Sequence, residues 1–426
     1  MKKRRVAILC ASLMAVSAVF GGCGSTAKEA GGTESAAGTQ ADQTQKGGTV
    51  SLKVWAAEED ADLMSQIIDS FKQEYGSQAN FDITVEAQSE STCKDNLLGD
   101  VLNGTDVFTF VDDQLMALVA AGALEPVEDA ASVSAANNEN AVAASKVGDT
   151  LYAYPLTADN GYFMYYNKAY FSDSDVQSLD QMLAVAAASG KKVSIDLSSA
   201  WYDYTFFGNT GMELGLNDDG ISNYCTWNSQ DGAIKGIDVA QAMLGIATNP
   251  GFINEVDADF LASAENGSVI AGVSGVWNAN ALEQLWGENY GAAKLPTYTC
   301  AGQQVQMASF SGYKMVGVNA YSKNTEWAGK LADWITNEKN QTLRFEERGQ
   351  GPANTNAANS AEVKASAAIQ AVLAQAEYAD LQRVGGNFWD PVQTFAEQIA
   401  AGNPNGEDLQ KLLDTMVKGI TASNGQ

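Results

Sequence analysis

Residues 49–87 read TVSLKVWAAEEDADLMSQIIDSFKQEYGSQANFDITVEA, and this stretch decides the predicted fold class. Apolar residues alternate with polar ones over residues 50–54, and a period of two predicts a β-strand. From residue 60 to residue 75 the apolar positions follow helical spacing, with acidic residues at the start and Gly76 after the end. A second alternating run over residues 81–85 completes a strand–helix–strand unit.

The same alternation continues along the rest of the chain. Further strands are expected at residues 106–111, 151–155, 161–166, 192–197 and 268–274. This pattern predicts an α/β fold with mostly parallel sheets that are flanked by helices. The length of 426 residues fits two domains, and no long linker divides the chain after residue 49. We therefore expect the chain to cross between two lobes more than once.

The composition excludes several classes of function. The chain has 25 Lys and Arg residues against 52 Asp and Glu residues, and its net charge of −27 argues against binding nucleic acid. It contains no histidine, which excludes Ser-His-Asp and Cys-His catalysis and histidine-ligated zinc. Residues 217–220 (NDDG) lack the first and last ligands of a calcium loop, because Gly215 and Thr226 stand at those positions. Since no nucleotide-binding motif occurs either, the sequence predicts no metal and no cofactor.

The N-terminus has the pattern of an export signal. Residues 2–5 (KKRR) are followed by an apolar run over residues 6–20, which is shorter than a membrane span needs. Two glycines then precede Cys23. We therefore predict that residues 1–22 are a signal peptide that is removed on export.

The glycine pair before Cys23 resembles the lipobox of bacterial lipoproteins, although Phe20 stands where leucine is usual. The resemblance implies that Cys23 becomes the first residue and carries lipid, with plain secretion as the alternative. Residues 23–48 are rich in Gly, Ala, Ser, Thr, Gln and Glu and contain no aromatic residue, so they are expected to form a flexible tether. The protein is thus expected at the extracellular face of the cytoplasmic membrane.

Aromatic rings, carboxylates and amides recur just after the expected strands and near turns. Ligands of open α/β sheets bind beyond the carboxyl ends of the strands, so such residues are candidates for a site. Sugars need this combination, because their C–H faces stack on aromatic rings and their hydroxyl groups pair with carboxylates and amides. The candidates for ligand binding are Trp55, Glu58, Glu59, Asp113, Asp159, Tyr202, Trp277, Asn278 and Trp389. By contrast, Trp327 and Trp334 have helical spacing and are predicted to lie in a core.

Two of these carboxylates could also serve a glycosidase, which needs two acids on either side of the scissile bond. Glu58 or Glu59 with Asp113 or Asp159 could take those roles. Carboxylates that only accept hydrogen bonds from sugar hydroxyls have the same sequence pattern. We predict a binding protein without catalytic residues and keep the glycosidase as an alternative.

Three cysteines lie beyond the predicted signal and anchor. Cys225 and Cys300 both lie in polar stretches that look like loops, and they are the candidate disulfide in an oxidising compartment. Cys93 would then carry a free thiol.

Several stretches together resemble the extracellular solute-binding proteins of bacterial ABC sugar importers, in particular the maltose/maltodextrin-binding proteins. They are residues 54–55, 104–127 (GTDVFTFVDDQLMALVAAGALEPV), 151–168 (LYAYPLTADNGYFMYYNK), 268–298, 317–322 and 386–391 (GNFWDP). The resemblance implies two lobes that close on a sugar by bending at a hinge, each built from discontinuous segments. Residues 49–157 and 303–362 would form the N-terminal lobe, and residues 158–302 and 363–426 the C-terminal lobe.

The resemblance also carries roles over to single residues. Trp55 matches the tryptophan that ends the first strand, Glu59 matches an acid that bonds sugar hydroxyls, and Asp60 stands where the family often has lysine. Phe110 replaces the stacking tryptophan of the family's W-x-x-D-R stretch and is expected to bind the ligand in its place, and Asp113 matches the acid of that stretch.

The remaining matches lie further along the chain. Asp159 matches a ligand-binding acid at the first hinge crossing, and Tyr202 matches an aromatic ring in the cleft. Trp277 and Trp389 match the two stacking tryptophans of the second lobe, whereas Gln114 replaces an arginine of the family. Maltodextrin is the first expected ligand, and the replaced residues leave another glucan or a galactose-containing oligomer open.

The function implied by the resemblance is that of a monomeric receptor. It would capture an oligosaccharide and deliver it to the transmembrane subunits of an ABC permease. The alternatives are a secreted glycosidase and a receptor for a peptide or an amino acid.

Overall fold

The computed structural model describes residues 48–422. The predicted signal peptide, Cys23 and the tether up to residue 47 lie outside the described residues, so their assignment stays a prediction. Within the described part of the chain, none of the helices combines the length and the apolar character that crossing a membrane requires.

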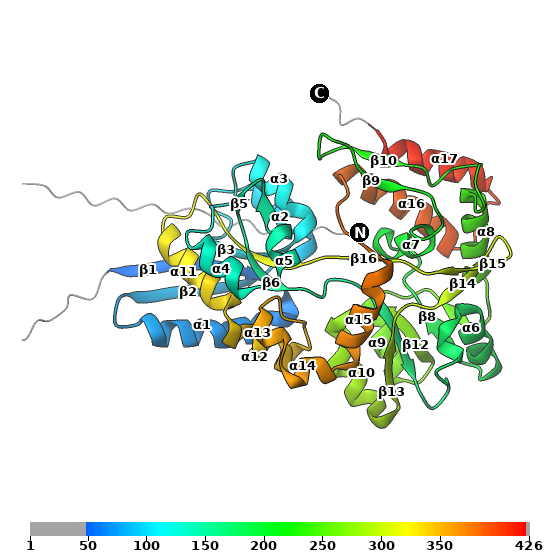
Figure 1. The fold of residues 1–426 in the computed structure, drawn as a ribbon, viewed down its shortest axis with the longest axis horizontal. Coiled ribbons are helices and arrows are strands. Elements are labelled where there is room, and N and C mark those ends of the chain that lie inside the picture. The colour runs from blue at the N-terminus through cyan, green and yellow to red at the C-terminus, as the bar shows by residue number, and fades with distance from the viewer. Residues whose placement is uncertain (1–47, 423–426) are drawn as a thin grey trace, which may run out of the picture. The chain divides into compact units, whose positions relative to one another are not determined.

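The first sheet, which contains β1 and β2 at the left of Figure 1, has five strands in the order β2-β1-β3-β17-β6. Their bounds are Thr49–Ala56 for β1, Asn80–Ala87 for β2, Val107–Val111 for β3, Tyr154–Thr157 for β6 and Lys314–Val318 for β17. β1 runs parallel to β2 and β3, with α1 (Ala61–Tyr75) between β1 and β2 along the chain. The predicted strand–helix–strand unit is therefore confirmed.

The second sheet also has five strands, in the order β11-β8-β12-β7-β13. Their bounds are Phe163–Asn167 for β7, Lys192–Ser194 for β8, Phe252–Ile253 for β11, Val269–Ser274 for β12 and Tyr290–Ala293 for β13. β8 is parallel to β11 and β12, but β7 is antiparallel to β12 and β13.

In each sheet four of the five strands run in the same direction, so the expectation of mostly parallel sheets is confirmed, although one strand in each runs against the others. In the first sheet β17 runs antiparallel to both β3 and β6. The reason is topological, because β17 enters the first sheet only after the chain has completed the second. The order of the strands thus shows that residues far apart in the sequence build one sheet, and the α/β class is confirmed.

Short strands and hairpins complete the fold. β14 (Thr297–Cys300) pairs with β15 (Gln303–Gln306), and β16 (Ser309–Ser311) pairs with β18 (Ala379–Leu381). The other short strands are β4 (Lys146–Val147), β5 (Thr150–Leu151), β9 (Leu214–Leu216) and β10 (Asn223–Cys225). The expected lobe boundaries stay a prediction, and the one at residue 303 divides the β14–β15 hairpin.

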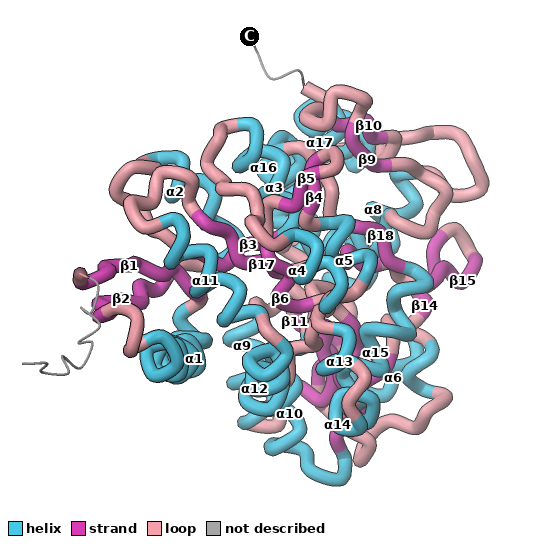
Figure 2. The backbone as a smooth tube through the Cα atoms, turned by 60° about the vertical axis from the view of Figure 1, so that its left-hand side comes forward, coloured by secondary structure: helices cyan, strands magenta, loops and turns pink. Residues whose placement is uncertain are grey.

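Helices surround the two sheets (Figure 2). After α1 they are α2 (Cys93–Gly99), α3 (Leu115–Ala120), α4 (Ala130–Ala136), α5 (Glu139–Ala144), α6 (Leu179–Ala188), α7 (Ala200–Phe207) and α8 (Gly236–Ala247). They continue with α9 (Asp257–Glu265), α10 (Ala279–Trp286), α11 (Thr325–Thr336), α12 (Glu338–Arg348), α13 (Thr355–Ala358), α14 (Ala361–Ala365), α15 (Ala367–Gln375), α16 (Trp389–Ala400) and α17 (Leu409–Ile420).

The core of the first sheet contains an aromatic cluster. Phe71 of α1 is fully buried and packs edge-on against Trp327 and Trp334 of α11, with ring centroids 6.4 and 6.3 Å apart. The Trp334 Nε1 donates a hydrogen bond to Ser70 Oγ at 2.9 Å. These two tryptophans pack against the core and remain partly exposed, and their helical spacing predicts this inward side of α11.

The core of the second sheet extends toward the C-terminus. Trp227 is fully buried and stacks on Phe207 of α7, with ring centroids 4.3 Å apart and nearly parallel planes. The helices α16 and α17 pack on each other and on α8, so the end of the chain covers this core.

Candidate functional site

Short 3₁₀ turns follow three of the parallel strands and carry polar side chains to the edges of the sheets. They are η1 (Glu58–Asp60) after β1, η3 (Asp112–Gln114) after β3 and η5 (Val276–Asn278) after β12. The side chains of such a turn lie beyond the carboxyl end of the strand, where ligands of this fold class bind.

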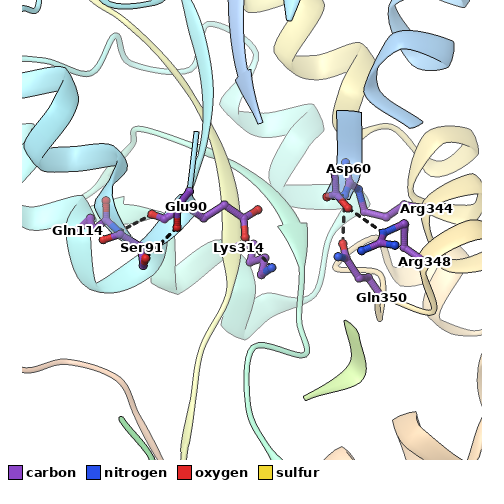
Figure 3. A network of polar contacts seen from close by, with 9 residues as sticks. Asp60, Glu90, Ser91, Gln114, Lys314, Arg344, Arg348 and Gln350 are labelled. Carbon is purple, nitrogen blue, oxygen red and sulfur yellow. Dashed lines mark hydrogen bonds and ion pairs between the residues drawn. The ribbon is translucent and has the colours of Figure 1, made fainter. Parts of the chain in front are cut away.

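The first group at this edge is an ion pair around Asp60 (Figure 3). The Asp60 carboxylate bonds to Arg344 and accepts a hydrogen bond from Arg348 Nε at 2.9 Å. Arg344 also donates to Gln350 Oε1 at 3.1 Å. Burial alone would raise the pKa of Asp60, but the two guanidinium groups and Lys314 hold that pKa below its ordinary value.

The second group contains Glu90 and Lys314 (Figure 3). Lys314, the first residue of β17, places its Nζ 2.6 Å from Glu90 Oε2, and both side chains are nearly buried. The backbone carbonyl of Glu90 accepts a hydrogen bond from Gln114 Nε2 at 2.7 Å. The Lys314 Nζ also lies 5.9 Å from the ring centroid of Trp277.

Two adjacent carboxylates follow β3. The Asp112 Oδ1 accepts a hydrogen bond from the Tyr313 amide at 3.1 Å, whereas Asp112 Oδ2 and Asp113 Oδ1 are buried without a hydrogen-bond partner in residues 48–422. Burial raises the pKa of Asp112 to about 7 and that of Asp113 to about 6. Each of the two carboxylates therefore has an oxygen atom that can accept a further hydrogen bond. The backbone at Gly312 passes close to Asp112, since a Cβ on Gly312 would lie 2.7 Å from Asp112 Oδ1.

Asp159 lies where the chain passes from the first sheet to the second. Its carboxylate accepts a hydrogen bond from the Gly351 amide, and it is 3% exposed. Burial raises the pKa of Asp159 to about 6, although that hydrogen bond opposes the shift.

Aromatic rings from the second sheet and its helices form a wall. Trp201 has ring centroids 5.9 Å from Trp277, 5.0 Å from Tyr202 and 4.6 Å from Tyr162. The Trp201 Nε1 donates to Gln382 Oε1 at 2.6 Å, which orients the indole. We call Tyr162, Trp201, Tyr202 and Trp277 the aromatic wall.

Asp257 of α9 is connected to the aromatic wall by hydrogen bonds. It accepts hydrogen bonds from Tyr202 Oη at 3.2 Å and from Ser274 Oγ at 2.6 Å. Ser274 in turn accepts a hydrogen bond from Asn278 Nδ2 at 2.9 Å. The predicted residues Tyr202, Trp277 and Asn278 are therefore brought into one network.

Other predicted residues lie elsewhere or have different surroundings. Trp55 is 9% exposed, packs in the core and donates from Nε1 to Glu86 Oε2 at 3.0 Å. Phe110 is fully buried against Phe108, with ring centroids 5.4 Å apart, so it presents no ring face to a ligand, and we leave it out of the proposed site. Glu58 and Glu59 are exposed.

Trp389 stands at the start of α16. Its ring lies 5.0 Å from that of Phe388, and it packs against the core of the second sheet while remaining partly exposed. The structure gives it no contact with the aromatic wall within the described residues, so its role in ligand binding stays a prediction.

The predicted disulfide is wrong. Cys225 and Cys300 are both free and buried, as is Cys93. Cys225 lies in β10, which pairs with β9, whereas Cys300 lies in β14, which pairs with β15, so the two thiols belong to separate hairpins. Burial raises the pKa of Cys225 and of Cys93 to about 12, which makes both thiols unreactive.

Several residues at the site were not indicated by the sequence pattern: Glu90, Asp257, Lys314, Arg344 and Gln382. Lys314 left one signal, since it is a basic residue at the head of the otherwise apolar strand KMVGV in a chain poor in basic residues. The other four stand in unremarkable polar stretches, and only the folded chain brings them together.

A cavity of about 480 Å³ lies beside the segments that connect the two sheets. Asp159, Tyr162, Tyr313 and Gly351 line it, together with the exposed face of α15. It shares Asp159 and Tyr162 with the groups described above, but Trp201, Trp277 and Asp113 do not line it.

This arrangement of mixed α/β sheets, buried carboxylates and an aromatic wall agrees with the comparison to known protein families. The family model described as bacterial extracellular solute-binding protein matches residues 66–371. The chain belongs to this family. The resemblance to the solute-binding proteins of ABC importers is thereby confirmed.

Curated relatives of this solute-binding protein carry the names of sugar-binding proteins. The galactooligosaccharide-binding protein of Bacillus subtilis (strain 168) is 27% identical over 421 residues, which cover 94% of this chain and 93% of the relative. The maltooligosaccharide ABC transporter solute-binding lipoprotein of Streptococcus pneumoniae (strain ATCC BAA-255 / R6) is 26% identical over 60% of this chain and 62% of the relative.

Solved structures confirm the two-lobed fold class. One structure with acarbose aligns with a TM-score of 0.78 and 27% identity, over 88% of this chain and 99% of that one. The maltodextrin-binding protein MalE1 from L. casei BL23 without ligand aligns with a TM-score of 0.73 and 24% identity, over 88% of this chain and all of that one.

Proposed function

We propose that this solute-binding protein captures an oligosaccharide between the two sheets and delivers it to an ABC permease. One observation carries the proposal. Lys314, at the start of β17 in the first sheet, places its Nζ 5.9 Å from the ring centroid of Trp277 in the aromatic wall, and Asp113, which follows β3, retains a buried oxygen without a partner within residues 48–422. Stacking faces and hydrogen-bond acceptors are the two features that recognise a sugar.

The carboxylates of the site offer acceptors for the hydroxyl groups of a sugar. Asp112, Asp113 and Asp159 are all buried, with pKa values raised to about 7, 6 and 6, so each accepts hydrogen bonds best near and above neutral pH. Hydroxyl groups that donate to these carboxylates would replace the water that burial removes. A ligand that contacts both sheets would favour the closed form, which is the form a permease recognises.

Two sugar classes are the first candidates for the ligand. Maltodextrin is favoured by the resemblance of several stretches of the chain, and by the names of the relatives from Streptococcus pneumoniae. A galactose-containing oligosaccharide is favoured by the relative that matches nearly the whole chain. The replacement of a stacking tryptophan by the buried Phe110 is consistent with a ligand that differs from maltose.

We further propose that the protein works as a monomer tethered to the membrane by a lipid on Cys23. The export pattern of residues 1–22 and the lipoprotein relatives support this proposal. Labelling cells with a radioactive fatty acid would test it, since Cys23→Ser should abolish incorporation and release the protein to the medium. Incorporation into the Cys23→Ser variant would contradict the anchor.

Titration calorimetry tests the proposed function directly. The purified protein would be titrated with maltose, maltotriose, a longer maltodextrin and a panel of β-linked and galactose-containing oligosaccharides. Micromolar or tighter binding to one linkage class, with the sugar recovered intact, is the expected result. Cleavage of the sugar would favour a glycosidase, and silence across the panel would favour a receptor for a peptide or an amino acid.

A further inference from the structure

Lys314 is placed to act between the two sheets. It starts β17 of the first sheet, and its Nζ pairs with Glu90 Oε2 at 2.6 Å. The same Nζ lies 5.9 Å from the ring centroid of Trp277, which is within the range of a cation–π contact. A single ammonium group thus pairs with a carboxylate and also lies within cation–π range of the aromatic wall.

The two partners of Lys314 belong to different parts of the fold. Glu90 lies in η2 (Glu90–Thr92), directly before α2, whose Cys93 and Leu97 pack in the core around β3. Trp277 follows β12 and packs against the core that contains Phe163 and Phe260. The contacts of Lys314 therefore link the first sheet to the stacking ring of the second.

The surroundings keep Lys314 charged. Burial opposes the charged form, but the carboxylates of Glu90, Asp60 and Asp159 raise the pKa of Lys314 above its ordinary value. An ammonium group has three hydrogens to donate, and Glu90 is the one ion-pair partner of Lys314 within residues 48–422. Two donors consequently remain for a ligand.

We propose that Lys314 is a specificity-determining residue of the sugar site. Its ammonium donates to hydroxyl groups of the sugar ring that stacks on Trp277, and its pair with Glu90 connects that ring to the first sheet. The inference rests on the proposed function, which it deepens by naming a charged donor at the stacking ring. Only sugars with hydroxyl groups on the rim that faces Lys314 would satisfy it, because a buried donor without a partner costs free energy.

Substitution of Lys314 tests the inference against a matched control. Lys330 offers the same chemistry away from the site, since it pairs with Glu326 Oε1 at 2.7 Å and lies 4.4 Å from the ring centroid of Trp327. A charge-assisted hydrogen bond contributes enough free energy that Lys314→Met should weaken sugar binding by about tenfold or more. Lys330→Met should leave the affinity within about twofold of the unsubstituted protein.

Two further variants separate recognition from folding. Lys314→Met leaves Glu90 as a buried, unpaired carboxylate, so the double variant Lys314→Met/Glu90→Gln removes both charges. We expect the double variant to melt close to the unsubstituted protein and still to bind about tenfold or more weakly. Lys314→Arg keeps a charged donor with a different shape, so it should restore binding partly and alter the order of preference among the sugars.

The outcomes are distinguishable. If the unsubstituted protein binds a sugar and the double variant binds it within about twofold, the inference is overturned and the proposed function stands. Should the unsubstituted protein bind none of the sugars, the proposed function and the inference both fail. Equal losses in Lys314→Met and Lys330→Met would also overturn the inference, because they would show a general effect of removing charge.

Discussion

The carboxylate of Asp60 and the guanidinium of Arg344 form an ion pair inside the protein, with side chains that are 3% and 1% exposed. The two residues are 284 positions apart in the sequence. Arg348 also bonds to Asp60, and Gln350 bonds to Arg344, so the pair belongs to a network that joins η1 to the end of α12 (Figure 3). A buried pair of this kind is costly to break, because the remaining partner keeps an uncompensated charge.

We expect Asp60→Asn to destabilise the protein by about 3 to 5 kcal/mol, since it leaves Arg344 buried without its anion. Urea denaturation followed by circular dichroism would measure the loss. Glu326→Gln is the control, because the exposed Glu326–Lys330 pair should contribute no more than about 1 kcal/mol. Equal losses in the two variants would contradict the importance of burial.

The Asp60 pair also predicts a dependence of stability on pH. The pKa of Asp60 is lowered in the folded protein, so its contribution is present above the unfolded value of 3.8 and is lost as the pH falls below that value. The free energy of unfolding should therefore fall more steeply below pH 4 in the unsubstituted protein than in Asp60→Asn. Parallel curves for the two proteins would contradict the prediction.

Ionisation of Asp203 should lower the stability of the folded protein, whereas ionisation of Asp60 raises it. It is fully buried in α7, neither of its carboxylate oxygens has a hydrogen-bond partner within residues 48–422, and burial raises its pKa well above the ordinary value. Because the folded state retains the proton longer than the unfolded state, Asp203 lowers stability progressively as the pH rises above its unfolded value of 3.8.

Asp203→Leu should therefore stabilise the protein at pH 7, by about 1 to 3 kcal/mol, since it removes a buried polar group without a partner. Thermal denaturation between pH 4 and pH 8 would measure the change. Asp203→Asn removes the titration but retains a buried polar group, so it should flatten the pH dependence with a smaller gain. A loss of stability in Asp203→Leu at pH 7 would show that the carboxylate has a partner.

Sugar affinity should depend on pH through Asp112 and Asp113. Hydroxyl groups that donate to these carboxylates favour the ionised form, and burial raises the pKa values of the free protein to about 7 and about 6. Binding must then release protons at acidic pH, so affinity should fall as the pH decreases from 8 to 5.5, by up to about tenfold for each pH unit below a pKa. Calorimetry in buffers of different ionisation enthalpy would detect the released protons.

Asp113→Asn supplies the control for this pH dependence. Its affinity should be lower at pH 8 and should vary less between pH 8 and pH 5.5 than that of the unsubstituted protein. An affinity that rises as the pH falls would contradict the assignment of these carboxylates as acceptors.

Removal of a ring from the aromatic wall should weaken binding without unfolding the protein. Trp277→Ala and Trp201→Ala each remove a stacking face that is partly exposed, and we expect a loss of affinity of about tenfold to a hundredfold. Trp327→Ala is the control, because Trp327 packs on Phe71 in the core of the first sheet. That variant should lose stability by about 3 kcal/mol or more and retain sugar affinity. Unchanged sugar binding in both wall variants would refute the site.

Local patterns in the chain were sufficient for the elements and for part of the site. A period of two or of 3.6 places apolar side chains on one face, and the hydrophobic effect buries that face whatever the topology. The strand–helix–strand unit at residues 49–87 and the packing of Trp327 and Trp334 against a core could be predicted for this reason. The sequence singled out Tyr202 and Trp277 by their polar neighbours; the structure brings both beside Trp201, and their role in binding a ligand stays a prediction.

Long-range relationships required the folded chain. The antiparallel entry of β17 into the first sheet, the pair of Asp60 with Arg344 and the position of Lys314 all depend on where a distant segment returns. Charged pairs carry no periodic signal, since one partner does not constrain the sequence around the other. Burial of Phe110 and of the free thiols of Cys225 and Cys300 depends likewise on neighbours supplied by other elements. Short-range periodicity therefore determines which residues form strands and helices, whereas chain crossing and close packing determine which polar groups meet.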